Sequence, residues 1–228
     1  DVWGGARAKA SWNAIESSNP FIKWFGFDDL DESAMFAVGE ALNWTFSPYQ
    51  LNPLGFNPLR GILERTVDCA AIQACERFKL FICATNVRTG QAKIFRNEDA
   101  SIDVLLASAA LPFLFQAVEI GGEAYWDGGY IGNPSLWPLF YEAQCRDLLL
   151  IHVNPVMRRD IPRRAYAIQN RLNEVTFNAS LLKELRAIAF VKKLIEEDML
   201  RPEYQSRYKD ILVHAVRSDT VMSALPVA

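Results

Sequence analysis

Apolar residues along the chain fall into two kinds of pattern, and their order predicts the arrangement of the elements. Residues 78–85 and 147–153 are short and strongly apolar, as expected for strands buried in an α/β sheet. Between residues 163 and 200 the apolar positions recur at steps of three and four, which indicates a long helix with one apolar face. Strands that alternate with helices favour an α/β layered domain.

Capping and turn residues predict the shorter elements. Asn57-Pro58 combines an N-cap residue with proline at the first helical position. Ser101 and Pro112 mark the start and the stop of another helix. Arg88-Thr89-Gly90 is a turn sequence between two short apolar runs, so it predicts a hairpin. Gly121-Gly122 separates two further strand-like runs. The further elements expected are helices at residues 58–67, 101–110 and 135–143 and strands at residues 92–95, 116–120, 123–126 and 211–216.

The first quarter of the chain has a different character. Residues 3–17 are rich in alanine and predict a helix, which Asn19-Pro20 ends. Residues 20–56 interleave aromatic residues, acidic residues and prolines, so we expect irregular structure with short helices. Two interpretations stay open for the aromatic-rich region at about residues 18–75: a cap that packs on the main domain, or a lid that forms a wall for acyl chains.

Composition excludes several classes of protein. Half of the 228 residues are hydrophobic, which excludes a disordered chain. The chain has 24 Lys and Arg against 27 Asp and Glu, so it lacks the basic surplus typical of nucleic-acid binding, and we expect no nucleic-acid partner. The longest apolar stretch, residues 104–118, is too short to span a bilayer. Since no signal-peptide pattern opens the chain, we expect a cytoplasmic location.

Cysteine and histidine form no pattern typical of a metal site. The four cysteines show no C-x-x-C pair, so we expect free thiols in the core: Cys69, Cys75, Cys83 and Cys145. The only histidines are His152 and His214, which makes a metal site unexpected. Because His152 lies in an apolar strand, we interpret it as a satisfied or edge histidine rather than a catalytic one.

Four arginines surround Pro162: Arg158, Arg159, Arg163 and Arg164. One interpretation is that they contact anionic lipid headgroups in a peripheral membrane contact. The other interpretation is a solvated loop that leads into the following helix. The sequence alone leaves both open.

Trp126-Asp127-Gly128-Gly129 is the sharpest candidate for chemistry. An aspartate stands at the end of a short strand, and two glycines follow it. Glycine permits both positive φ and close backbone approach, so the carboxylate could be held on a tight turn and aimed into a cleft. Locally, an ordinary Asp-Gly turn between two strands explains the same letters.

An ordered series of motifs surrounds this turn and resembles bacterial patatin-like phospholipases. The resemblance covers residues 78–216, and residues 3–76 more loosely. It implies one three-layer α/β sandwich over residues 1–228, with a central, mostly parallel sheet and a cap. The motifs are Ala84-Thr85-Asn86-Val87-Arg88-Thr89-Gly90, Ala107-Ser108-Ala109-Ala110-Leu111-Pro112, Trp126-Asp127-Gly128-Gly129, Asn133-Pro134, Asn154-Pro155 and Asn170-Arg171-Leu172-Asn173-Glu174.

The resemblance implies an acyl ester hydrolase that acts on lipids or other hydrophobic esters. In that family a serine in a G-x-S-x-G elbow attacks the ester carbonyl, an aspartate activates this serine, and a glycine-rich loop stabilises the oxyanion. The aspartate of the D-G-G motif corresponds to Asp127, and Gly128, Gly129 and Asn133 would shape its surroundings. No metal or organic cofactor is implied.

The chain departs from this pattern because none of its serines has glycine two residues before and two residues after it. We therefore expect the nucleophile to lie in an N-terminal family segment outside these residues, and this chain alone to be inactive. The first strands of the sheet would belong to the same segment. The alternative is a non-catalytic lipid-binding or interaction protein on the same scaffold. A metal hydrolase is disfavoured, because the two histidines stand alone.

Overall fold

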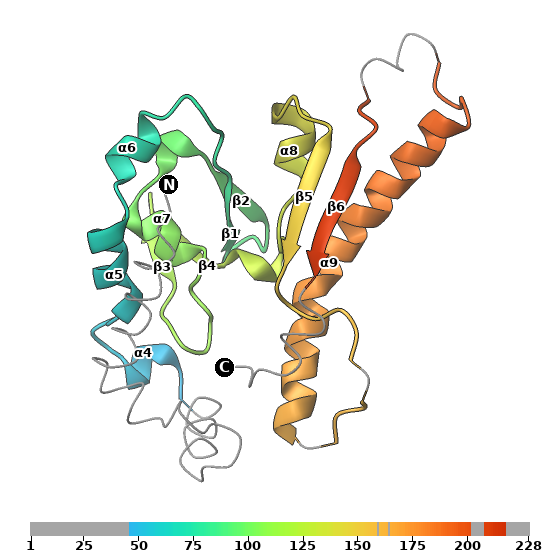
Figure 1. Ribbon diagram of the computed structural model, residues 1–228. Helices are drawn as coiled ribbons and strands as arrows, with labels where there is room; N and C mark the ends of the chain where they lie inside the picture. The colour runs from blue at the N-terminus through green and yellow to red at the C-terminus, as the bar shows by residue number, and fades with distance from the viewer. Residues whose placement is uncertain (1–45, 159, 164, 202–207, 218–228) are drawn as a thin grey trace.

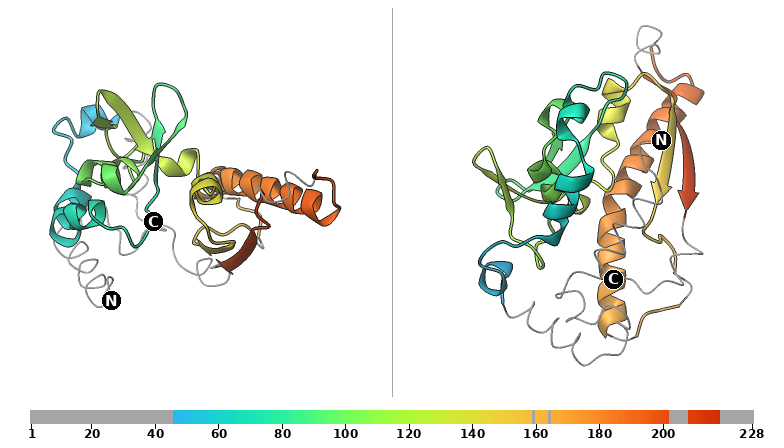
Figure 2. Two further views of the ribbon diagram at one scale, coloured as in Figure 1. Left: turned by 90° about the horizontal axis from the view of Figure 1, so that it is seen from above. Right: turned by 60° about the vertical axis from the view of Figure 1, so that its left-hand side comes forward.

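A computed structural model of the chain describes residues 46–158, 160–163, 165–201 and 208–217 (Figure 1). The helix expected at residues 3–17 and the aromatic tract up to residue 45 lie outside these described residues. The described elements form two groups that differ in sheet type (Figure 2). One group is a four-stranded sheet with short helices, and the other is a pair of strands beside one long helix.

The first group comprises the elements that precede and build the larger sheet. They are α4 (Pro48–Leu51), α5 (Pro58–Thr66), α6 (Cys69–Gln73), β1 (Ile82–Asn86), β2 (Ala92–Phe95), the 3-10 helix η1 (Asn97–Asp99), α7 (Ile102–Ala107), β3 (Val118–Ile120) and β4 (Glu123–Asp127). The second group follows directly. It comprises the 3-10 helix η2 (Gly128–Tyr130), α8 (Trp137–Glu142), β5 (Asp147–His152), α9 (Ala165–Glu196) and β6 (Leu212–Arg217).

The predicted caps and turns explain why these elements begin and end where they do. The Asn57 side chain accepts a hydrogen bond from the Leu59 N–H at 3.0 Å and caps α5. The Ser101 hydroxyl accepts one from the Val104 N–H at 3.2 Å and caps α7. Gly121-Gly122 turns the β3–β4 hairpin with φ of 60° and 82°, a conformation that favours glycine. The predicted elements of the described part are therefore present, although α7 ends earlier than expected.

The larger sheet is antiparallel throughout, in the order β2-β1-β4-β3. The pairing of β1 with β4 places Ala84 opposite Asp127. Ala84, Phe95 and Tyr125 are buried in the core of this sheet together with Val104 and other residues of α7. The helix α7 therefore covers one face of the sheet and supports the strand that ends at Asp127.

The second group is a single β–α–β unit. Strands β5 and β6 pair in parallel, and α9 connects them over 32 residues. Leu150 of β5 packs with Leu181 and Ile188 of α9, and Leu136 joins the same cluster. None of the described helices is both long enough and apolar enough to cross a membrane.

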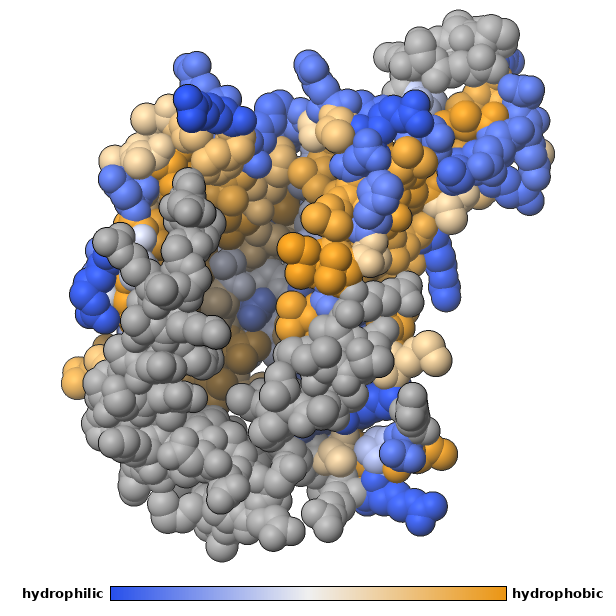
Figure 3. Space-filling model, viewed as in Figure 1, coloured by the Kyte–Doolittle hydropathy of each residue, from blue (hydrophilic) through white to orange (hydrophobic). Residues whose placement is uncertain are grey.

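The helices and sheets of the described part fit the expected α/β class, but a central, mostly parallel sheet is not seen there. The main sheet is antiparallel because tight turns connect β1 to β2 and β3 to β4, and the parallel pairing is confined to β5 and β6. The expectation that β5 is buried on both faces is wrong. Leu149 and Ile151, on the face away from α9, are 63% and 70% exposed, and apolar side chains gather over this sheet in Figure 3.

Candidate active site

The backbone of Asp127 is fixed on both sides at the end of β4. Its N–H donates to the Ala110 carbonyl oxygen at 2.9 Å, just beyond α7. Its own carbonyl oxygen accepts a hydrogen bond from the Thr85 hydroxyl of β1 at 2.7 Å. A helix end and a neighbouring strand therefore hold this residue, so its position depends on the whole sheet.

The Asp127 side chain turns back onto the following glycine turn. Its Oδ1 accepts a hydrogen bond from the Gly129 N–H at 2.6 Å, while Oδ2 has no hydrogen-bond partner among the described residues. Burial raises the pKa of the Asp127 carboxyl, and the Gly129 hydrogen bond opposes this effect only in part. A carboxylate with a raised pKa is a stronger base, which suits proton abstraction from a hydroxyl.

The two glycines are required by close packing. A Cβ on Gly128 would lie 2.1 Å from the Cys83 carbonyl oxygen, and a Cβ on Gly129 would lie 2.3 Å from the ring of Phe177. Both distances are too short for any side chain. Neither glycine has positive φ, so of the two reasons expected for glycine here, only close approach applies.

A pocket of about 200 Å³ lies beside the carboxylate. The four site residues that the sequence predicted all line it. The lining residues are Phe81, Cys83, Ile94, Ser108, Asp127, Gly128, Gly129, Gly132, Asn133, Pro134 and Ser135. Segments far apart in the sequence therefore meet at this pocket: β1, the end of α7, and the turn after β4.

Two serines line the pocket, and each uses its hydroxyl in a local contact. The Ser135 hydroxyl donates to the Cys83 sulfur at 3.2 Å, and the Ser108 hydroxyl donates to the Leu105 carbonyl oxygen at 2.8 Å. Burial raises the pKa of the Cys83 thiol, and the nearby Asp127 carboxylate adds to this rise. The thiol is therefore held in its protonated form.

Sequence reasoning missed the part of α9 that supports the glycine turn. Phe177 packs on Tyr130 with ring centroids 5.0 Å apart. The Ser180 hydroxyl accepts from the Asn133 N–H at 3.1 Å, and Glu184 accepts from the Leu136 N–H at 2.6 Å. Phe177, Ser180 and Glu184 are spaced at steps of three and four, so they share one face of the helix. That spacing was visible in the sequence, but nothing there indicated which partner this face contacts.

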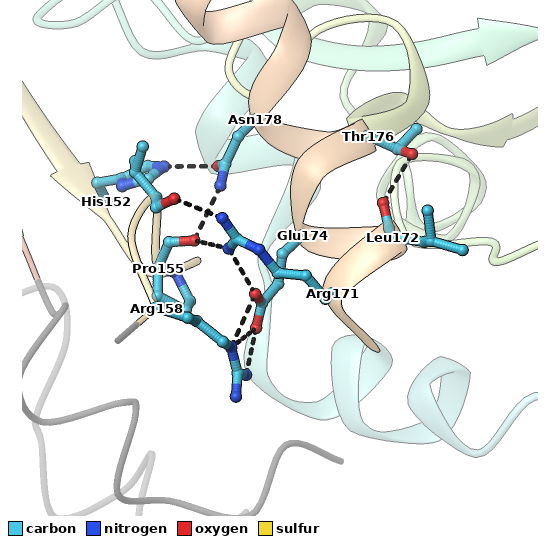
Figure 4. Close-up of polar contacts among 9 residues, drawn as sticks. His152, Pro155, Arg158, Arg171, Leu172, Glu174, Thr176 and Asn178 are labelled. Atoms are coloured by element: carbon cyan, nitrogen blue, oxygen red, sulfur yellow. Dashed lines mark hydrogen bonds and ion pairs between the residues drawn. The ribbon is translucent and has the colours of Figure 1, made fainter. Parts of the chain in front are cut away.

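Arg158, one of the four arginines around Pro162, forms an ion pair with a buried carboxylate. Figure 4 shows the buried Glu174 carboxylate between the guanidinium groups of Arg158 and Arg171. The Arg158 Nε lies 3.0 Å from Glu174 Oε2, and the Arg171 Nη2 donates to the Val156 carbonyl oxygen at 2.8 Å. Because Arg158 pairs with Glu174, neither a contact with lipid headgroups nor a solvated loop describes the role of this arginine. Arg159 and Arg164 lie outside the described residues.

Neighbouring residues complete this contact between α9 and the loop after β5. The Asn178 side chain donates to the Pro155 carbonyl oxygen at 3.1 Å, and its oxygen lies 2.9 Å from the His152 Nε2. His152 is buried, so its interpretation as a satisfied histidine is confirmed. His214, by contrast, is exposed and contacts the Asp147 carboxylate at 2.8 Å.

The four cysteines are free, as expected. Their predicted place in the core is wrong, because three are only partly buried and Cys145 is exposed. Within the described ranges, no three His, Cys, Asp or Glu side chains form a group that could hold a metal ion.

We predict that Gly128→Ala lowers the free energy of unfolding by about 2 kcal/mol or more, because the new methyl group would overlap the backbone of β1. Urea denaturation of both proteins measures this difference. Gly61→Ala is the matched control, since Gly61 lies inside α5 and its Cβ would meet only the flexible end of Arg65 at 3.4 Å. Equal effects of the two substitutions would contradict the prediction.

We predict that Asp127→Asn raises the free energy of unfolding at neutral pH. Burial raises the pKa of Asp127 in the folded state, so folding favours the protonated form, and stability falls as the pH rises through this raised pKa. Asparagine avoids this penalty. Denaturation curves at several pH values should therefore show the largest gain near neutral pH and little gain in acid, where the aspartate is protonated in both states. An unchanged or lower stability at neutral pH would refute this.

We predict that Glu174→Gln lowers the free energy of unfolding by about 2–3 kcal/mol, because two arginines lose their buried counter-charge. Burial alone would raise the pKa of Glu174, but hydrogen bonds from Arg158 and Arg171 outweigh it and lower the pKa. The contribution of the ionised carboxylate is therefore present above its ordinary pKa and is lost as the pH falls. Urea denaturation at neutral and acid pH tests this, with the exposed Glu119→Gln as control.

A comparison with models of known protein families finds a match for this chain. The model of the patatin-like phospholipases matches residues 8–140. This range covers more than half of the chain and contains Asp127 and its glycine turn. A comparison with curated proteins finds no match. The chain belongs to the family of patatin-like phospholipases.

Proposed function

We propose that this chain carries the aspartate of a serine–aspartate dyad that hydrolyses lipid acyl esters. One observation carries the proposal: a half-buried carboxylate with a raised pKa lines a pocket at the end of β4. Asp127 is the general base, and Gly128 and Gly129 hold its turn. Asn133 forms part of the pocket wall. Membership of a phospholipase family supports lipids as the substrate class.

The proposed reaction uses the free oxygen of the carboxylate. While Gly129 holds Oδ1, Oδ2 accepts the proton of the serine hydroxyl as this oxygen attacks the ester carbonyl. A bond forms between the serine oxygen and the acyl carbon, the ester bond breaks, and Asp127 returns the proton to the leaving alcohol. Water then cleaves the acyl-enzyme in the same way, and the acid is released.

The proposed nucleophile is a serine outside these residues. The serines that line the pocket are poor candidates, because Ser108 and Ser135 use their hydroxyls in local contacts. Neither stands in the strained, glycine-flanked turn that exposes a nucleophile. On this proposal, the present chain alone is inactive.

We also propose that the segment with the serine completes a mostly parallel central sheet in one domain. Parallel sheets are normally covered on both faces, whereas α9 covers only one face of β5 and β6. The exposed Leu149 and Ile151 on the other face support further chain packing there.

We predict that a longer protein, with the preceding residues included, hydrolyses p-nitrophenyl esters and phospholipids, and that Asp127→Asn lowers kcat by a factor of about 100 or more. Asparagine keeps the shape and loses the base. Asp147→Asn is the matched control, because Asp147 lies at the exposed start of β5.

Activity of the Asp127→Asn protein at the level of the unchanged protein would refute the assignment. If the longer protein binds lipid but hydrolyses no ester, the alternative of a non-catalytic lipid-binding protein holds instead.

A further inference from the structure

Two stretches of chain without charged residues meet on the surface near α4. They are residues 46–59 and residues 104–118. The Gln116 side chain donates to the Asn52 carbonyl oxygen at 2.7 Å, and the Ala117 N–H donates to the Tyr49 hydroxyl oxygen at 3.2 Å. Figure 1 shows α4 next to the start of β3, where these contacts lie. The two stretches therefore form one surface.

Large apolar side chains are exposed on this surface. Leu54 is 93% exposed and Phe56 is 67% exposed. Their exposed neighbours include Tyr49, Leu51 and Leu114. We call Tyr49, Leu51, Leu54, Phe56 and Leu114 the uncharged surface. A group of exposed apolar side chains of this kind marks an interaction site more often than a chance arrangement.

The arginine at the border of the uncharged surface is neutralised by an aspartate. Arg60 directly follows the first stretch and Asp103 directly precedes the second, and their side chains form an ion pair at 2.5 Å. Glu119, which directly follows the second stretch, is exposed, so among the described residues this border carries no positive excess. Such a surface fits a zwitterionic lipid layer, since it offers nothing that would attract anionic headgroups or nucleic acid.

One of the two stretches also contributes to the pocket. Ser108 lines the pocket, the Ala110 carbonyl oxygen binds the Asp127 N–H, and the chain then runs directly through Leu114 to Gln116. Leu114 of the uncharged surface and Ser108 of the pocket therefore belong to one short segment, which is tied to the proposed base through Ala110. A partner that carries the substrate is therefore the occupant that best explains why the apolar side chains are exposed here.

We propose that the protein rests on zwitterionic lipid through the uncharged surface. This inference rests on the proposed function for its choice of partner. Leu54 and Phe56 enter the boundary between headgroups and acyl chains, and Tyr49 lies at the polar level. Binding comes from the burial of apolar groups, so salt has little effect on it.

Sedimentation of the 228-residue chain with phosphatidylcholine vesicles tests the proposal. We expect binding that is equal at low and high salt. Leu54→Asp and Phe56→Asp should each raise the apparent Kd about tenfold or more. Ile161→Asp is the matched control, because Ile161 is an equally exposed aliphatic residue at 84%, in the loop between β5 and α9. Circular dichroism checks that each variant is folded.

Several results would overturn the proposal. They are the absence of binding by the unchanged chain, an equal loss in the Ile161→Asp control, and binding only to phosphatidylglycerol vesicles that high salt abolishes. Gel filtration can give a fourth such result. If the unchanged chain is a dimer that Leu54→Asp dissociates, and it binds no vesicles, the uncharged surface is a contact with a second copy of the chain.

The test is separate from the test of the hydrolase function, because vesicle binding needs no nucleophile. In a longer, active protein, Leu54→Asp should leave hydrolysis of water-soluble esters unchanged and lower hydrolysis of vesicle lipid. Asp127→Asn should abolish both without changing vesicle binding.

Discussion

The contact between the backbone of β1 and the glycine turn after β4 is the constraint on which the site depends. The Cys83 carbonyl group lies so close to Gly128 that no side chain fits between them. The Asp127 backbone is tied to β1 through the Thr85 hydroxyl and to the end of α7 through the Ala110 carbonyl. The position of one carboxylate is therefore set by the packing of a whole sheet.

The same arrangement sets up a conflict between stability and chemistry. A half-buried carboxylate costs stability in its charged form, because burial removes it from water. Among the described residues, one hydrogen bond to the Asp127 carboxylate, donated by the Gly129 N–H, offsets part of this cost. Partly buried carboxylates with a raised pKa are common in active sites, where the group must act as a base.

Much of the local structure could be predicted from the sequence, because caps and turns are short-range signals. Asn57 and Ser101 begin helices as expected, and Gly121-Gly122 turns a hairpin. The D-G-G motif indicates Asp127 as the candidate base. The sheet topology is harder to predict from the sequence, because the pairing of strands depends on contacts between distant residues. The apolar run around Leu149 is compatible with a strand that is covered on one face or on both. The packing of Phe177 on Tyr130 and the burial of Glu174 could not be predicted for the same reason, since their partners lie far away in the sequence.

Helix α9 supports the turn and loop that follow Asp127, and this has a consequence for where the protein can be divided. The family match ends at residue 140, but Phe177, Ser180 and Glu184 hold the turn and loop after Asp127 from beyond that point. A protein shortened to the matched range would keep the aspartate and its glycines, and it would lose the helix that presses on them. The site therefore extends beyond the end of the family match. Truncation at residue 140 would leave the Asp127 carboxylate on a turn that α9 no longer supports.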